Sequence, residues 1–154
     1  MMLEIIPFEK QYANAFYKLN IEWLESYFYV EPLDKEVLSN PEIYIINKGG
    51  FIFFVRLDNK IVGTVALMPT TDRSILELTK MAISPTLRGQ NMGQKLMQHC
   101  IDFAKEQNLK SLILYTNSKL KNAIHIYSKY GFVNVPVEEN SPYTRGDIKM
   151  ILDL

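Results

Sequence analysis

The chain has 154 residues, of which 47% are hydrophobic, and its 17 basic residues balance its 17 acidic ones. This length and composition predict one compact domain spanning residues 1–154, because such a chain can bury a core of its own and has no room for a second domain. The balanced charge argues against binding to nucleic acid or to an anionic membrane, and the lack of a signal sequence or membrane-length apolar run predicts a cytoplasmic protein.

The first third of the sequence predicts one strand and two helices. Residues 3–7 are apolar and of strand length, and residues 8–24 carry apolar side chains at helical spacing. An aromatic stretch then ends at Pro32, and residues 34–39 form a second helix that stops before Asn40-Pro41. One face of the longer helix is expected to be packed.

A hairpin is the clearest prediction in the middle of the chain. Residues 51–56 and 60–68 have strand character and are separated by a turn at residues 57–59. A third strand over residues 74–83 follows and completes a three-stranded meander. This meander leads directly into a loop with the features of a phosphate-binding site.

That loop belongs to the segment Glu77–Gly93, which contains a strand, a turn marked by Pro85 and a glycine-containing stretch that opens into a helix ending near Gln107. The first turn of a helix carries unpaired backbone N–H groups and a partial positive charge. The backbone from Arg88 to Gln94 could therefore wrap a pyrophosphate. The segment lacks both the Gly-Lys-Ser/Thr ending of a P-loop and the G-x-G-x-x-G of a dinucleotide-binding fold.

The remaining elements complete the predicted fold. Residues 111–115 form a strand, and the crossover that starts at residue 78 is long enough to make the two strands parallel neighbours. A helix over residues 119–130 and late strands at 132–135 and 148–152 follow. The predicted class is α+β: a mixed, mostly antiparallel central sheet of about six or seven strands, with helices on both faces.

Two motifs resemble signatures of the GNAT superfamily of N-acetyltransferases. The first, Arg88-Gly89-Gln90-Asn91-Met92-Gly93, is similar to the Arg/Gln-x-x-Gly-x-Gly/Ala of motif A, with Asn91 in place of the first glycine. The second, from Asn122 to Phe132, resembles the Ala-x-x-Leu-Tyr-x-Lys-x-Gly-Phe signature. Asparagine tolerates positive φ better than other non-glycine residues, so the turn at Asn91 is expected to survive.

The resemblance implies that acetyl-CoA is the cofactor and that it lies where two central parallel strands splay apart. Its pantetheine arm would pair with the exposed backbone of the first of these strands, and its diphosphate would lie on the glycine-containing loop. An asparagine near Leu120 would help to hold it, although Asn117 is equally suited to capping a helix. The cofactor-binding candidates are Met81, Ala82, Ile83, Arg88, Gly89, Gln90, Asn91, Met92, Gly93, Gln94, Asn117 and Asn122.

The resemblance also places the acceptor between the first two helices and the sheet. Aromatic residues are the candidates to line that pocket: Trp23, Tyr27, Phe28 and Tyr29. Packing in the core or at a homodimer contact is the alternative for these side chains. The expected acceptor is a primary amine of a small molecule or a peptide, and the sequence does not identify it further.

Acetyl transfer to an amine requires a proton acceptor for the amine and a proton donor for the departing thiolate. Tyr127 matches the general-acid tyrosine of the family, and a phenol with a pKa of about 10 stays protonated at neutral pH. The position of Glu77 resembles that of the catalytic glutamate in histone-acetylating members of the family. Glu77 would take the proton from the amine directly or through a water. The alternative for Tyr127 is a packing role in the core. The alternative for Glu77 is an ordinary exposed residue at the start of a strand, with a chain of waters as the base instead.

Other activities find less support in the sequence. No metal site is expected, because His99 and His125 are predicted to face solvent without an acidic partner, and Cys100 lies on an apolar helix stripe as a core thiol. A nucleotide hydrolase is disfavoured by the missing Lys-Ser/Thr pair. A non-catalytic acyl-CoA-binding or regulatory module on the same fold stays open, favoured slightly by Asn91. The edge strands also leave a homodimer open.

Overall fold

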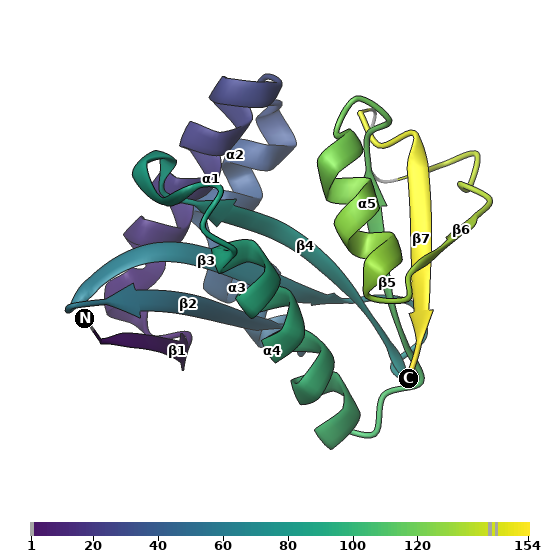
Figure 1. The fold of residues 1–154 in the computed structure, drawn as a ribbon, viewed down its shortest axis with the longest axis horizontal. Helices are drawn as coiled ribbons and strands as arrows, with labels where there is room; N and C mark the ends of the chain where they lie inside the picture. Colours follow the sequence, from purple (N-terminus) through teal and green to yellow (C-terminus); the bar gives the residue numbers. More distant parts are fainter. Residues whose placement is uncertain (1, 142, 144) are drawn as a thin grey trace.

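The computed structural model describes residues 2–141, 143 and 145–154, which form a seven-stranded sheet of order β1-β2-β3-β4-β5-β7-β6 (Figure 1). The strands are β1 (Leu3–Pro7), β2 (Phe51–Leu57), β3 (Lys60–Pro69), β4 (Ile75–Ile83), β5 (Ser111–Thr116), β6 (Val133–Val135) and β7 (Ile148–Asp153). Neighbouring strands are antiparallel except for β4 and β5, which are parallel. The predicted fold class and the parallel central pair are confirmed.

The longer helices agree with the sequence prediction, with shifts at their ends, whereas a short helix at Pro41–Tyr44 was not predicted. They are α1 (Ala13–Tyr27), α2 (Pro32–Ser39), α3 (Pro41–Tyr44), α4 (Met92–Glu106) and α5 (Lys121–Lys129), with 3-10 turns at Lys10–Tyr12, Ile46–Lys48 and Pro85–Leu87. The first predicted helix begins later than residue 8 and extends beyond residue 24. Within the described residues, none of these helices combines the length and apolar character needed to cross a membrane.

The β2–β3 hairpin closes through a turn that the sequence fits. Asp58 and Asn59 both have positive φ, at 49° and 68°. A two-residue type I′ turn requires positive φ at both positions, and Asp and Asn tolerate it better than most residues. The predicted turn is therefore confirmed. It pairs Leu57 with Lys60, and a bulge between Val55 and Arg56 then shifts the register so that Phe54 pairs with Thr64.

Side chains of β2 alternate between two hydrophobic cores. Ile52 and Phe54 belong to the core on the α1 face, where Phe16 is fully buried. Phe53 belongs to the core on the opposite face, to which α4 contributes Leu96. This period of two is the pleat of a strand with both faces covered, so helices lie on both faces of the sheet as predicted.

The parallel pair β4–β5 separates part-way along its length. The two strands pair only from Ile75 to Glu77 with Ser111 to Ile113, although β4 continues to Ile83 and β5 to Thr116. Figure 1 shows the two strands diverging beyond this short ladder. The splay that the family resemblance implied is present, and it leaves the remainder of β4 without a strand partner on its β5 side.

Candidate active site

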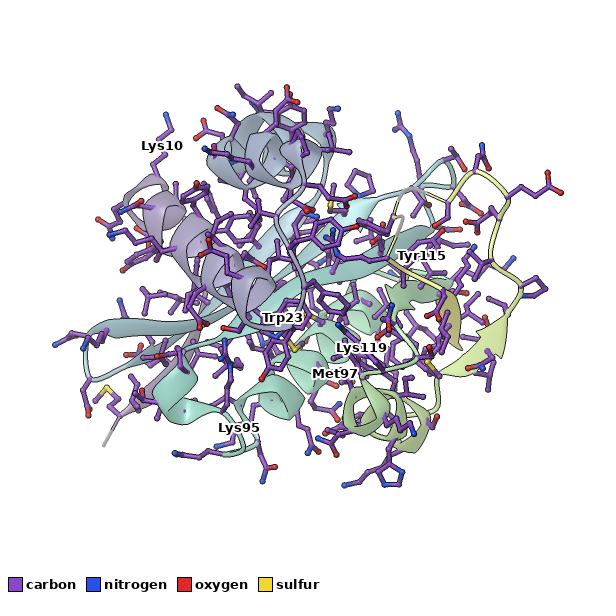
Figure 2. The ribbon with its side chains drawn as sticks, turned by 90° about the horizontal axis from the view of Figure 1, so that it is seen from above. Lys10, Trp23, Lys95, Met97, Tyr115 and Lys119 are labelled. Atoms are coloured by element: carbon purple, nitrogen blue, oxygen red, sulfur yellow. The ribbon has the colours of Figure 1, made fainter. Side chains whose placement is uncertain are left out.

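A cavity of about 510 Å³ lies where β4 and β5 separate. Helices α1 and α2 supply one wall, β4 a second, and β5 with the start of α5 a third, while the loop before β7 closes one end. In Figure 2, Trp23 of α1, Tyr115 of β5 and Lys119 after β5 lie around this region, whereas Lys10 and Lys95 point away from it. Half of the predicted site residues line this cavity.

The aromatic residues predicted for the acceptor side are mostly brought together. Trp23, Tyr27 and Phe28 line the cavity. The Trp23 ring centroid lies 5.1 Å from that of Tyr27 and 5.7 Å from that of Phe28. Tyr29 is 57% exposed and is not a lining residue. The three-ring cluster therefore forms an apolar wall, and Tyr29 lies outside it.

The predicted pantetheine strand borders the cavity. Met81 and Ile83 are lining residues. Ala82 is buried, with 1% of its surface exposed, and its backbone pairs with Thr64 of β3. Because β4 has no strand partner on the other side at this point, its backbone groups there are available to a ligand.

The loop before α4 presents backbone N–H groups that have no protein acceptor. In the described part of the chain, no N–H from Arg88 to Gln94 donates a hydrogen bond; the first donor is the N–H of Lys95, 3.1 Å from the carbonyl of Asn91. Gly89 and Asn91 have φ of 82° and 63°. Asn91 therefore adopts the left-handed conformation expected of it. The result is a row of free donors at the N-terminus of a 15-residue helix.

The Arg88 side chain points away from this row of donors. Its guanidinium forms an ion pair with Glu22 of α1 and lies 5.3 Å from the centre of the Tyr27 ring. The backbone of Arg88 remains in the loop, but its charge is used to tie the loop to α1. A contact from the Arg88 side chain to a phosphate is therefore not what the structure favours.

The remaining residues of the loop differ in their burial and in their contacts. Gln90 is exposed, whereas Met92 is buried in the core with 6% of its surface exposed. The Nε2 of Gln94 donates to Asn91 Oδ1 at 3.3 Å. A Cβ atom on Gly93 would lie 3.3 Å from the sulfur of Met81. Glycine thus lets the first turn of α4 approach β4 closely.

Asn117 and Asn122 both line the cavity, but their side chains differ in availability. Asn117 donates to the Arg145 carbonyl at 2.7 Å and accepts from the Lys119 N–H at 3.0 Å, so its amide is used within the protein. It does not cap α5, whose N-cap residue is Leu120. Asn122 is exposed and has no hydrogen-bond partner among the described residues. Asn122 is therefore the better placed of the two to contact a ligand.

Tyr127 lies on α5 and reaches the cavity. Its ring packs edge-on against Phe132, with 6.0 Å between centroids. Its hydroxyl forms no hydrogen bond with any residue that the structure describes. Burial raises the pKa of Tyr127 above that of an ordinary phenol. The hydroxyl therefore stays protonated at neutral pH and is free to donate into the cavity.

Glu77 is buried, with 8% of its surface exposed, and does not itself line the cavity. Its Oε2 accepts a hydrogen bond of 2.6 Å from the hydroxyl of Tyr143, which does line the cavity. Burial raises the pKa of Glu77, although the Tyr143 hydrogen bond and the charge of Lys80 oppose the shift. Tyr143 thus stands between Glu77 and the cavity, and sequence reasoning missed it because it lies in a loop without a motif.

Arg145 fastens the loop before β7 to the start of α2. Its guanidinium donates to Glu31 at 2.7 Å and to both oxygens of Asp34, at 2.8 and 3.0 Å. Burial opposes ionisation of Asp34, but the bonds from Arg145 and the backbone outweigh it and lower the pKa of that carboxyl. These bonds form a half-buried clamp that holds the cavity wall.

The structure corrects the expectation for one histidine. His125 is exposed as predicted, but the ring of His99 packs edge-on against Phe53 at 4.5 Å, and burial lowers its pKa. Cys100 is fully buried, as expected of a core thiol, and burial raises its pKa. Across residues 2–141, 143 and 145–154, no three His, Cys or acidic residues form a group that could hold a metal.

Comparison with known proteins decides the family. A sequence profile of the acetyltransferase (GNAT) family matches residues 10–132. The chain belongs to this family. The probable N-acetyltransferase camello of Xenopus tropicalis is 30% identical over 107 residues, which cover 69% of this chain and 49% of that protein. This chain therefore spans about half the length of such curated relatives.

Solved GNAT structures share the fold over nearly the whole chain. A GNAT-family acetyltransferase from Staphylococcus aureus Mu50 aligns with a TM-score of 0.86 at 24% identity and covers 99% of both chains. The PaiA N-acetyltransferase of Thermoplasma acidophilum, solved in complex with coenzyme A, aligns with a TM-score of 0.77 at 15% identity. The resemblance that the two sequence motifs indicated is thus confirmed at the level of family and fold.

Proposed function

We propose that this GNAT protein is an acetyl-CoA-dependent N-acetyltransferase in which a primary amine attacks the acetyl group directly. The main support is the row of unpaired N–H groups from Arg88 to Gln94, at a helix N-terminus beside the cavity between β4 and β5. A diphosphate satisfies donors of this kind. Family membership and the N-acetyltransferase relatives point to the same chemistry.

The residues present fit acetyl-CoA. The N–H groups of the loop from Arg88 to Gln94 would hold its diphosphate, the free edge of β4 from Met81 to Ile83 would pair with its pantetheine arm, and Asn122 would contact it from α5. Acetyl-CoA would supply the thioester, whose carbon–sulfur bond breaks as a carbon–nitrogen bond to the acceptor amine forms.

Two protons must move in this reaction, and the cavity offers a group for each. The acceptor amine loses its proton to the hydroxyl of Tyr143, which passes its own proton to Glu77 along their 2.6 Å hydrogen bond. The hydroxyl of Tyr127 gives its proton to the thiolate that leaves. One proton enters the protein on Glu77 and one leaves it from Tyr127, and exchange with solvent restores both.

An assay of thiol release from acetyl-CoA tests this proposal against the non-catalytic module. Pooled amino acids, polyamines and peptides serve as acceptors, and coenzyme A binding is measured in parallel by calorimetry. Thiol release that depends on an amine supports the enzyme. Binding of coenzyme A without turnover of any amine would favour the module. The slight case that Asn91 made for the module is weakened, because Asn91 takes the conformation that the loop needs.

If the loop from Arg88 to Gln94 binds the diphosphate of coenzyme A, a substitution that strains Asn91 should weaken coenzyme A binding. Asn91→Val places a β-branched side chain at a φ of 63°, which costs about 1–2 kcal/mol in the left-handed region. If the loop must keep this shape to align its N–H groups, the dissociation constant for coenzyme A should rise about tenfold. Asn91→Gly keeps the conformation accessible and should bind within about twofold of the parent. Isothermal titration calorimetry measures both.

Asn108 offers a matched control for this strain. It also has positive φ, 58°, but it lies after the far end of α4. Asn108→Val introduces the same kind of strain away from the loop, so it should lower the free energy of unfolding by at most about 1–2 kcal/mol and leave coenzyme A affinity unchanged. Equal affinities for Asn91→Val and Asn108→Val would contradict the assignment of the diphosphate to this loop.

A further inference from the structure

Lys80 occupies an unusual place in the wall of the cavity. The register between β3 and β4 shifts between Thr64 and Ala66, and Lys80 has a φ of 55°. Strict alternation would put Lys80 on the same face as Leu78, in the core beneath α4. The bulge instead brings its side chain to the cavity, within 5.6 Å of the centre of the Tyr143 ring. Strain of this kind commonly marks a functional position.

Lys80 is partly buried, yet it forms no ion pair with any described residue. Other cations that line the same cavity have partners: Arg145 holds Glu31 and Asp34, Arg88 holds Glu22, and Lys119 donates to a backbone carbonyl at 2.8 Å. Lys121 is exposed at the start of α5, where water solvates it. The ammonium of Lys80 is therefore withdrawn from solvent and makes no direct ion pair among the described residues, although the charges of Glu77 and Asp34 act on it.

The carboxylates nearest to Lys80 are occupied. Both oxygens of Asp34 accept hydrogen bonds from Arg145, and Oε2 of Glu77 accepts from Tyr143. Burial lowers the pKa of Lys80, while the charges of Glu77 and Asp34 act to raise it and that of Arg145 acts to lower it. A partly buried ammonium in such surroundings is stabilised by an incoming anion.

We propose that the acceptor carries a carboxylate as well as its amine, and that Lys80 binds this carboxylate. One ammonium beside two acidic side chains suits a single negative charge better than a phosphate, which the acids would repel. The apolar wall of Trp23, Tyr27 and Phe28 suits an aromatic body on the same molecule. The acceptor class is thus an aromatic amino acid. This inference rests on the proposed function, because it names the acceptor of that reaction.

Phenylalanine and phenylalaninamide form the probe pair, because they differ only in the carboxylate. We compare the ratio of their kcat/KM values in the parent and in Lys80→Met, so that the different basicities of the two amines cancel. Loss of a charge-assisted hydrogen bond should reduce the acid-to-amide ratio about 10- to 100-fold. Lys121→Met, which removes a cation at the cavity rim, should leave the ratio unchanged.

A binding measurement separates this inference from the proposed function. In the presence of coenzyme A, N-acetylphenylalanine should bind the parent protein more tightly than N-acetylphenylalaninamide, and Lys80→Met should abolish the difference. Lys80→Asn repeats the test with a neutral residue that tolerates positive φ, in case the methionine variant does not fold. If the parent protein shows this binding preference but acetylates no amine, the carboxylate-binding role of Lys80 is supported and the proposed N-acetyltransferase activity is refuted. Equal binding of both ligands by the parent, or no binding of either, overturns the inference.

Discussion

Tyr127→Phe is expected to lower kcat about 100-fold or more, because it removes the proposed proton donor for the leaving thiolate. The change deletes only the hydroxyl oxygen. The ring keeps its edge-on contact with Phe132 at 6.0 Å, and the hydroxyl has no hydrogen bond to lose among the described residues. Stability and coenzyme A affinity should therefore stay near the parent values. Steady-state kinetics together with urea unfolding measure the three quantities.

Tyr130→Phe is the matched control for this substitution. Tyr130 lies directly after α5, and Tyr130→Phe also removes only a hydroxyl. Tyr130 does not line the cavity. Its hydroxyl donates to Gln94 at 3.4 Å, which is a long hydrogen bond. The kcat of Tyr130→Phe should remain within about threefold of the parent value. If Tyr127→Phe behaved like Tyr130→Phe, the acid would have to be water or another group, and the core role of Tyr127 would stand.

The sequence predicted those parts of the site that depend on consecutive residues. The loop at Asn91 and the helix that carries Tyr127 are local motifs, so their conformation and order could be inferred from residue types and spacing. Contacts that depend on the tertiary fold could not. Tyr143 meets Glu77 across 66 positions, and Arg145 meets Asp34 across 111.

Lys80 shows a second limit of sequence reasoning. In the predicted strand over residues 74–83, alternation assigns one face to Leu76, Leu78 and Lys80. A single bulge reverses that assignment after Thr79, and no glycine or proline marks it in the sequence. The fold was predictable because the hydrophobic pattern is redundant over many residues, whereas the position of Lys80 depends on one irregularity in one strand.

The second large effect is expected at the Glu77–Tyr143 pair. Glu77→Gln removes the proposed final proton acceptor, and Tyr143→Phe removes the cavity-lining hydroxyl that donates to Glu77 at 2.6 Å. Each should lower kcat about 100-fold. Both residues act on one proton path. The kcat of the double variant should therefore lie within about threefold of the kcat of the slower single variant. Independent roles would instead make the two losses multiply.

The pH dependence gives a separate test of the same pair. Glu77 accepts a proton only when ionised, and burial raises its pKa above the ordinary value of a carboxyl. The kcat/KM of the parent, corrected for the fraction of unprotonated amine, should therefore fall as the pH drops through that raised pKa, and this acidic limb should disappear in Glu77→Gln. Tyr115→Phe is the control, because Tyr115 also lines the cavity and lies 5.4 Å from the Tyr143 ring, but its hydroxyl donates to Glu138. An acidic limb that persisted in Glu77→Gln would assign the base to water or to another group, and would leave Glu77 with the structural role of holding Tyr143 in the cavity wall.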